Sequence, residues 1–365
     1  MEAVTHEWLR AATLADWRAV RLELEDGEIQ LEQCLRLLPG KRLAARARFL
    51  GRQVFAKVFF GPDHEQLARL ERRNMEALRG ADVALPEPLG IHEGEGVTVL
   101  CAEWLEDASE VGDVICSGGD AVIDDLLLQI ERIYQAGFYQ KDLHLGNFVY
   151  SGDGIQVVDS GAIARLPSGR WRRNRIVIRN LGLLCAQAPL GLADLLRTRI
   201  QVFFKLSGLQ KLRLHRVKDK ALKRRIRKAN RKWLRSCSAI REVKGANESL
   251  LLDRAFADRE NEIQRILRDP CAWPLIKKGS RISVHECGGW IIKHYHDTSL
   301  HARIKRGTGL DSGRRSWVMG LTLNHLGFPT PGPIARASYS DGSGVLLFPR
   351  VDGEKFSHLM KRDPA

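Results

Sequence analysis

The 365-residue sequence contains no long apolar run. A helix that crosses a membrane needs about 18 or more consecutive apolar residues. The most apolar window, residues 176–196, is interrupted by Arg179, Asn180, Pro189 and Asp194. The first seven residues carry two acids and no apolar core, unlike a secretory signal peptide. We therefore expect a cytoplasmic chain that can contact a membrane only at its surface.

Paired cysteines are also missing. The seven cysteines are scattered, and no two of them form a Cys-x-x-Cys motif: Cys34, Cys101, Cys116, Cys185, Cys237, Cys271 and Cys287. Zinc sites and small disulfide frameworks depend on closely spaced cysteines. The scatter therefore predicts free thiols in a reducing compartment.

Acidic residues are too few to balance the bases, which gives a net charge of +14. Such a charge favours partners that carry phosphate or carboxylate groups. Between Lys205 and Lys244 stand sixteen Lys or Arg residues against only two acids, Asp219 and Glu242. Three interpretations are open: a solvated helix, contact with acidic headgroups at a membrane, or nucleic-acid binding. Aromatic residues are sparse there and no nucleic-acid-binding motif is visible, so we expect no nucleic-acid partner.

The residues most informative about chemistry lie between Gln140 and Gly161. Asp142 and Asn147 are five residues apart, and Asp159 follows twelve residues later, after the apolar run 155–158. The sequence Ser-Gly-Asp-Gly at 151–154 predicts a tight turn between two strands. This geometry brings two carboxyl groups and one amide oxygen together. Phosphoryl transfer needs a carboxylate near the attacking hydroxyl and oxygen ligands for Mg²⁺.

Three segments upstream have clear periodicity. Residues 53–60 predict a strand in which Lys57 has apolar neighbours on both sides, so that it would be half buried and need an anionic partner. Residues 64–79 predict a helix that offers Glu65, Glu71 and Glu76. Residues 97–105 predict another strand. The chain lacks Gly-x-Gly-x-x-Gly, so a loop covering phosphates would have to be 39–42, which can equally be a basic hairpin turn.

The order Lys57, Asp142, Asn147, Asp159-Ser160-Gly161 resembles that of the protein-kinase-like superfamily. The form Asp142-Leu143-His144-Leu145-Gly146-Asn147 is similar to that of the lipopolysaccharide core kinase family, which phosphorylates Kdo or heptose sugars. The resemblance implies an α+β, bilobal kinase-like fold and an ATP-dependent sugar kinase. It also implies an anionic glycolipid acceptor and a position in the cytoplasm at the inner membrane. Gln140 departs from the family, where His is usual.

The resemblance also implies roles for individual residues, with ATP and Mg²⁺ as cofactors. Asp142 would be the catalytic base, and Asn147 and Asp159 would bind Mg²⁺. Lys57, Glu71 (selected among the three helix acids by the resemblance), Glu103 and Leu105 would form the ATP site. The basic loop 165–175 would bind the acceptor through Arg170, Arg172 and Arg173. Two alternatives stay open: a kinase for another small-molecule or protein acceptor, and a pseudokinase that binds without turnover, which Gln140 and the missing glycine loop favour.

The second half of the chain repeats part of the first. Residues 290–295 with Lys293, a helix at 316–326 and a strand at 344–351 parallel the segments around Lys57. No Asp-x-x-x-x-Asn pattern follows Lys293 at a suitable distance, so this part predicts an incomplete second small lobe. We expect a kinase-like domain at 1–245 (small lobe about 20–105, large lobe about 106–245), a helical linker at 246–270 and the partial second small lobe at 271–365.

Overall fold

The computed structural model describes residues 20–38, 40–237, 239–297, 299, 301, 304 and 311–353. The fold is mixed α+β, as expected, and divides into two compact units. The first contains residues 1–188 and 192–221, and the second contains 189–191 and 222–365. The expected domains reach into residues 1–19 and 354–365, which lie outside the described residues. No helix in the described part of the chain is both long and apolar enough to cross a bilayer.

The first unit begins with a six-stranded antiparallel sheet in the order β1-β2-β3-β4-β6-β5. Its elements are β1 (Arg21–Leu24), β2 (Gly27–Leu38), β3 (Arg42–Phe49), β4 (Arg52–Phe59), β5 (Pro88–Gly94) and β6 (Val97–Glu103). Strand β3 alternates buried Leu43, Ala45, Ala47 and Phe49 with more exposed residues, because successive side chains point to opposite faces. The buried side chains on one face of this sheet pack together as a hydrophobic core.

Helix α2 (His64–Arg79) covers the other face of this sheet. Its buried residues Ala68, Glu71, Met75 and Leu78 recur at spacings of three and four, which places them on one side of the helix. Ala68 and Met75 pack with Phe59, Leu100 and Ala102 from β4 and β6. The packing therefore fixes which side chains of α2 can face the strands, and Glu71 is one of them.

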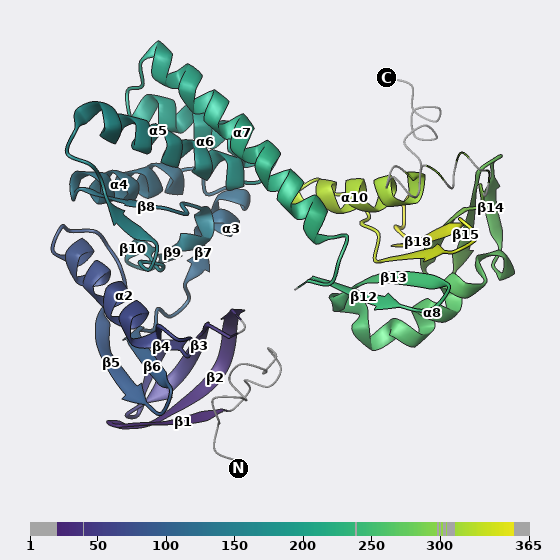
Figure 1. Ribbon diagram of the computed structural model, residues 1–365. Coiled ribbons are helices and arrows are strands. Elements are labelled where there is room, and N and C mark those ends of the chain that lie inside the picture. Colours follow the sequence, from purple (N-terminus) through teal and green to yellow (C-terminus); the bar gives the residue numbers. More distant parts are fainter. Residues whose placement is uncertain are drawn as a thin grey trace. The chain divides into compact units, whose positions relative to one another are not determined.

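The rest of the first unit is mainly helical (Figure 1). Its helices are α3 (Val111–Cys116), α4 (Val122–Gln135), α5 (Arg170–Gln187), α6 (Leu190–Phe203) and α7 (Gly208–Lys232), which continues into the second unit. Short strands lie between them: β7 (Ser109–Glu110), β8 (Phe138–Gln140), β9 (Phe148–Ser151), β10 (Gly154–Val157) and β11 (Ile163–Arg165). Leu126, Ile130, Leu181 and Leu196 belong to their common core.

Several expected elements are confirmed. The strand at 53–60 is β4, the helix at 64–79 is α2, and the turn at 151–154 joins β9 to β10 with Ser151 opposite Gly154. The basic loop expected at 165–175 is wrong, because α5 already begins at Arg170. The first turn of α5 is basic and has no acid, so its composition does not indicate a helix start. The helix is stabilised by packing and not by its own sequence preference.

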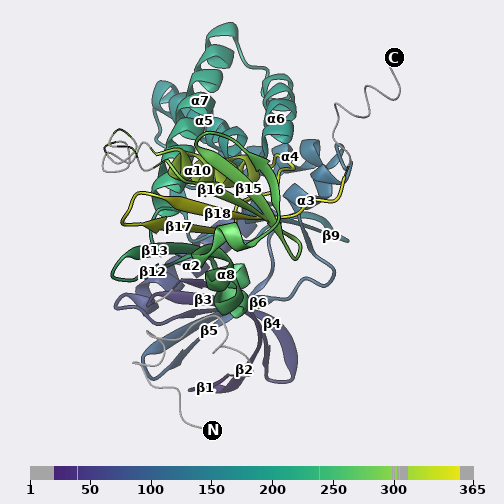
Figure 2. The same ribbon diagram turned by 90° about the vertical axis from the view of Figure 1, so that its right-hand side faces the viewer.

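The second unit is built on a seven-stranded antiparallel sheet, β12-β13-β17-β18-β16-β15-β14. Its strands are β12 (Ile240–Lys244), β13 (Glu248–Asp253), β14 (Leu275–Lys278), β15 (Ile282–Cys287), β16 (Trp290–Tyr295), β17 (Ala335–Tyr339) and β18 (Gly344–Pro349). Helices α8 (Glu260–Arg268) and α10 (Ser312–His325) lie on opposite faces of it (Figures 1 and 2).

The helical linker expected at 246–270 is corrected by this sheet. The expected boundary between residues 245 and 246 falls in the turn between β12 and β13, where Lys244 and Ser249 are register partners. Within 246–270 the helical residues are those of α8, the 3-10 turn Arg254–Arg259 and the first residue of the 3-10 turn Pro270–Ala272, and β13 is an inner strand. The run Leu250, Leu251 and Leu252 is apolar on successive residues because both faces of the strand are covered, and this pattern does not distinguish a strand from a helix.

Part of the first sheet recurs in the second. The order β2-β3-β4-β6-β5, with α2 between β4 and β5 in the chain, matches β14-β15-β16-β18-β17, with α10 between β16 and β17. Lys57 lies opposite Leu100 across the β4–β6 pair, and Lys293 lies opposite Leu346 across the β16–β18 pair. The similarity noticed in the sequence is therefore also a similarity of topology.

Candidate functional site

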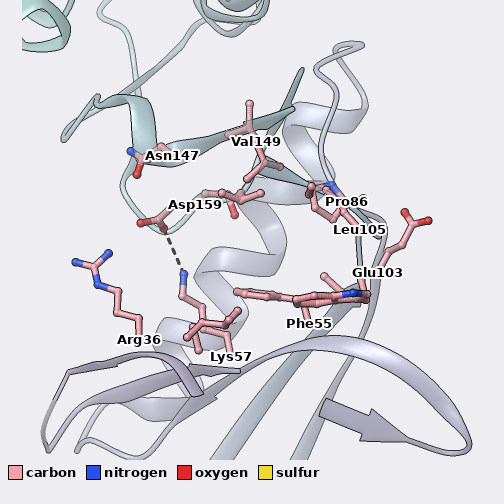
Figure 3. A pocket seen from close by; sticks show the side chains of 18 of the residues that line it. Arg36, Phe55, Lys57, Pro86, Glu103, Leu105, Asn147, Val149 and Asp159 are labelled. Atoms are coloured by element: carbon pink, nitrogen blue, oxygen red, sulfur yellow. Dashed lines mark hydrogen bonds and ion pairs between the residues drawn. The ribbon is translucent and has the colours of Figure 1, made fainter. Parts of the chain in front are cut away.

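A cavity of about 920 Å³ lies in the first unit, between the six-stranded sheet and the hairpin β9–β10 (Figure 3). Among the expected site residues, Lys57, Glu71, Glu103, Leu105, Asn147 and Asp159 line it. They come from β4, α2, the end of β6 and the segments on either side of β9–β10. The fold thus brings together residues that are up to 102 positions apart in the chain.

Lys57 is the centre of the ion pairs in this cavity. It is 6% exposed, and its Nζ lies 2.5 Å from Oε1 of Glu71 and 3.3 Å from Oδ1 of Asp159. A lysine buried this deeply needs anionic partners, because its charge would otherwise be desolvated without compensation. Strand β4 positions it, since Ala56 and Val58 on either side point into the core on the other face.

Glu71 connects α2 to the segment that carries Asp159. Its carboxylate is almost fully buried, with Arg42 Nη1 4.0 Å from Oε2. The Ser160 hydroxyl donates to the Glu71 carbonyl at 3.5 Å, and Asn74 Nδ2 donates to the Ser160 carbonyl at 2.9 Å. A Cβ atom at Gly161 would come within 2.9 Å of Glu71 Oε2. A side chain at residue 161 would therefore displace the Glu71 carboxylate, which glycine leaves in place.

Asp159 follows β10 and points into the cavity. Its Oδ1 accepts from Lys57 and from the backbone N–H of Gly161. Burial alone would raise the pKa of this carboxyl, but the charges of Lys57 and Arg42 together with these hydrogen bonds outweigh it, so the pKa lies below its usual value. The carboxylate is therefore ionised at neutral pH and able to bind a cation.

Asn147 and Asp142 are held by backbone contacts around the 3-10 turn Leu145–Asn147. Asn147 Nδ2 donates to the Asp142 carbonyl at 2.8 Å, and the Asn147 carbonyl accepts from the N–H of Val158 at 3.0 Å. These two bonds hold Asn147 between the residue at 142 and the strand leading to Asp159. With its nitrogen bonded in this way, the amide oxygen of Asn147 is the atom suited to a metal ion.

The Asp142 carboxylate is exposed and lies just outside the residues that line the cavity. Gln187, at the end of α5, donates through Nε2 to Asp142 Oδ1 at 3.1 Å and to the Leu143 carbonyl at 3.3 Å. Sequence reasoning missed Gln187, because 45 residues separate it from Asp142. The bond fixes one carboxylate oxygen, so that the side chain has a defined orientation.

Gln140 supports the Asp159 segment from behind. It is 1% exposed, and its Nε2 donates to the Asp159 carbonyl at 2.6 Å. Asn180 Nδ2 donates to the Gln140 carbonyl at 2.6 Å, and Asn180 Oδ1 accepts from the hydroxyl of Tyr134 at 2.8 Å. Burial raises the pKa of the Tyr134 phenol, which therefore stays protonated as the donor. Gln140 Oε1 has no hydrogen-bond partner among the described residues.

The remaining lining combines apolar walls, arginines of β2 and β3, and acids that follow β6, namely Glu106, Asp107 and Glu110. Apolar walls come from Phe55, Met75, Leu100, Ala102, Val149 and Val157, which suits a flat ring. The N–H of Glu103 donates to the Glu87 carbonyl at 2.8 Å and is therefore not available to ATP. Of the contacts expected at 103–105, those of the Glu103 carbonyl and of Leu105 remain.

Arg36, Arg42 and Arg46 also line the cavity. Arg42 belongs to the possible phosphate-covering turn at 39–42, but sequence reasoning missed Arg36 and Arg46. The alternation of β3 could have indicated two of the three, since Arg42 and Arg46 share the face opposite buried Leu43 and Ala45.

The expected acceptor-binding arginines do not line the cavity. Arg170 and Arg172 are exposed on the first turn of α5, and Arg173 Nη2 donates to the Tyr134 carbonyl at the end of α4. Of the possible phosphate-covering turn at 39–42, Pro39 lies outside the described residues and Arg42 lines the cavity. The cationic groups placed near the site are therefore those of β2 and β3.

Asp159 and Asn147 offer a metal ion one carboxylate and one amide oxygen. No group of three or more His, Cys, Asp and Glu side chains in the described residues is arranged to hold a metal. Asp159 and Asn147 fit Mg²⁺, which keeps waters and phosphate oxygens in its octahedral shell and needs only one or two protein carboxylates. The residues thus fit an ion that arrives with a phosphate ligand better than a permanently held one.

No known family model matches the chain, and no curated protein matches it.

Proposed function

We propose that the first unit is an ATP-dependent phosphotransferase with a protein-kinase-like bilobal arrangement. The observation that carries the proposal is the contact of Lys57 with both Glu71 and Asp159, at 2.5 and 3.3 Å, in a cavity that Asn147 also lines. Phosphoryl transfer is catalysed mainly by positioning and by neutralising charge. A lysine held by two acids beside a metal-binding amide is suited to that task.

Each residue has a defined role in this proposal. Lys57, kept in place by Glu71, binds the α and β phosphates of ATP. The apolar walls hold the adenine, with Leu105 and the Glu103 carbonyl at its polar edge. Asp159 and Asn147 are the ligands of Mg²⁺, which when bound neutralises charge on the phosphate oxygens. Asp142, oriented by Gln187, accepts the proton of the attacking hydroxyl.

The proposed acceptor is a sugar hydroxyl of the lipopolysaccharide inner core, on Kdo or heptose. It rests on the resemblance of the segment from Asp142 to Asn147. It is supported by the net charge of +14, which favours an acceptor rich in phosphate and carboxylate. Arg36, Arg42 and Arg46 on the cavity wall supply positive charge at the place where such an acceptor or the nucleotide would lie.

The proposed location is the cytoplasm, in peripheral contact with the inner membrane. Helix α7 supports it through a basic stripe of six exposed residues at spacings of three and four: Arg213, Arg216, Lys220, Arg224, Arg227 and Arg231. With a rise of about 1.5 Å per residue the stripe is about 27 Å long. The one acid of α7, Asp219, pairs with His215 instead. Anionic headgroups attract such a surface.

Turnover on purified core oligosaccharide tests the function directly. We expect Mg²⁺-dependent phosphate transfer from ATP to the oligosaccharide and none to a generic protein acceptor. Asp142→Asn should lower kcat by about 10² to 10⁴, the usual contribution of a general base, while leaving ATP binding in place. Asp153→Asn, an exposed acid of the β9–β10 turn, is the matched control.

Two results would count against the proposal. Phosphate transfer to protein but not to oligosaccharide would support the proposed kinase activity and contradict the proposed sugar acceptor. Nucleotide binding without turnover on any acceptor would leave a pseudokinase.

A further inference from the structure

The second unit contains a cavity of about 500 Å³ that the proposed phosphotransfer does not use. It is lined by β16, α10 and the end of β18, the elements that correspond in topology to β4, α2 and β6. Lys293 lines it from β16, as Lys57 lines the first cavity from β4. The helices also correspond. Glu71 and Met75, four residues apart on α2, line the first cavity. Arg315 and Met319, four residues apart on α10, line the second.

The charges of the two cavities differ in sign. In the first cavity, Glu71 and Asp159 compensate Lys57. In the second, Lys293 and Arg315 are the charged residues, and none of the described residues that line it is Asp or Glu. Lys293 Nζ lies 4.7 Å from the centroid of the Phe348 ring, so an aromatic face replaces the carboxylate.

Neighbouring charge does not alter this balance. Arg350, which adjoins the cavity in sequence, is already paired with Glu286 and Asp352. Among the described residues no salt bridge joins Lys293 or Arg315 to an acid, so these two cations favour an anionic ligand.

The walls of this cavity are mostly apolar. Ile291 and Phe348 lie along its strands, and Met319 and Val351 are 59% and 65% exposed although they are large apolar side chains. Exposed apolar side chains gathered around a cavity are typical of a ligand-binding surface. The ligand should therefore combine an anionic group with an apolar body.

We propose that this cavity binds an amphiphile with a phosphate monoester head. Two cations match the charge of −1.5 to about −2 that a phosphate monoester carries at neutral pH, whereas a carboxylate would need one. The apolar part of the ligand lies against Met319, Phe348 and Val351. A nucleotide with Mg²⁺ fits less well, because the residues that line the cavity include no acid or amide to bind the metal.

This inference does not depend on the proposed phosphotransfer, because the residues that carry it all lie in the second unit. It can be tested without any turnover.

Calorimetric titration of the full chain with decyl phosphate, below the concentration at which it forms micelles, tests the binding. Inorganic phosphate and decyl maltoside supply the head and the apolar body separately. We expect decyl phosphate to bind more tightly than either. Lys293→Met and Arg315→Gln should each weaken it about tenfold, the loss of one charge-assisted contact worth about 1.4 kcal/mol.

Arg314→Gln, which removes a neighbouring charge on α10 that does not line the cavity, should leave the affinity unchanged. Unfolding curves for each variant separate lost binding from lost folding.

The opposite results are equally clear. Equal binding of decyl maltoside would mean a plain apolar groove, and equal binding of inorganic phosphate would remove the apolar part of the ligand. Binding that survives both Lys293→Met and Arg315→Gln would place the ligand elsewhere. In a Lys57→Met background, ATP binding that Lys293→Met abolishes would make this a nucleotide site. Each of these outcomes overturns the proposal.

Discussion

Lys57 Nζ lies 2.5 Å from Glu71 Oε1, and both side chains are less than a tenth exposed. The pair joins the middle of β4 to the buried side of α2, and Asp159 extends it to the loop after β10. One buried cation therefore connects three segments of the first unit. The stability of this unit and its proposed chemistry depend on the same contact.

Removing Lys57 should destabilise the chain and stop turnover. Lys57→Met leaves Glu71 and Asp159 without their main cation, and breaking a buried pair in this way costs about 3–5 kcal/mol. The double variant Lys57→Met/Glu71→Leu should recover much of the free energy of unfolding, but none of the activity. It removes the more deeply buried carboxylate, and Asp159, whose side chain is 21% exposed, keeps the charge of Arg42 nearby. Urea unfolding and ATP turnover measure the two effects.

Lys293→Met is the matched control for stability. It removes a strand lysine whose described neighbours in its cavity include no acid, so the free energy of unfolding should change by less than about 1 kcal/mol. If Lys57→Met were as mild, the ion pairs of Lys57 would not stabilise the fold.

Gln187 should act by orienting Asp142. Gln187→Leu removes the donor 3.1 Å from Asp142 Oδ1, and we expect kcat to fall about tenfold with little change in KM for ATP. Steady-state kinetics on the oligosaccharide measure this. In an Asp142→Asn background the same change should have almost no further effect, because residues that act as a unit are not additive. Gln201→Leu on α6 is the control, and additive losses would contradict the orienting role.

Gln140 should be replaceable by histidine but not by leucine. Gln140→Leu removes the donor to the partly buried Asp159 carbonyl, and leaving a buried acceptor without its hydrogen bond costs about 1–3 kcal/mol. Gln140→His can supply a ring N–H to the same carbonyl and also removes the unpartnered Oε1. We expect the histidine variant to match the wild type in thermal unfolding and turnover. A leucine variant of full stability would show that this bond is unimportant.

Two buried thiols should make the protein less stable in alkali. Burial raises the pKa of Cys101 and of Cys185 to about 12, from an ordinary 9.0. Above pH 9 the unfolded chain loses these protons while the folded chain keeps them, so the free energy of unfolding falls as pH rises toward 12. The loss is at most about 1.4 kcal/mol per pH unit for each thiol.

The double variant Cys101→Ala/Cys185→Ala isolates this effect. Between pH 8 and pH 10 it should lose less stability than the wild type in urea unfolding. Buried Tyr134 and half-buried Tyr339, whose pKa values are also raised, contribute equally to both proteins and cancel. Equal losses in the two proteins would mean that the thiols are not responsible.

The basic stripe of α7 should bind anionic vesicles. Arg216→Gln/Arg227→Gln should weaken co-sedimentation with phosphatidylglycerol vesicles by about 2 kcal/mol, roughly thirtyfold, because each cation near the surface contributes about 1 kcal/mol. Lys277→Gln/Lys278→Gln removes the same net charge from exposed β14 and should change little. Binding that is insensitive to salt, or equally weakened by both pairs, would contradict the role of α7.

The local elements around the site followed from the sequence to within a residue or two. Strand β4, helix α2 and the β9–β10 turn each have a periodicity or a turn composition that belongs to one kind of structure. The first six residues of helix α5 and the strand β13 did not follow; the rest of α5 was expected as a helix at 176–186. Four of the six residues from Arg170 to Arg175 are charged, and Leu250 to Leu252 is apolar on every residue, so neither segment has a period that identifies it.

By itself the sequence determined which residue types stand at which spacing: the acids at 142 and 159, the amide at 147, the lysine at 57 and the excess of positive charge. Only the tertiary structure decided which of them meet. Among Glu65, Glu71 and Glu76, the packing of α2 turns Glu71 toward Lys57, while Glu65 and Glu76 pair with exposed arginines. The tertiary structure also places Gln187 beside Asp142, and it places the ring of Phe348, not an acid, beside Lys293. Such pairings depend on which faces are buried, and burial joins residues that no local pattern connects.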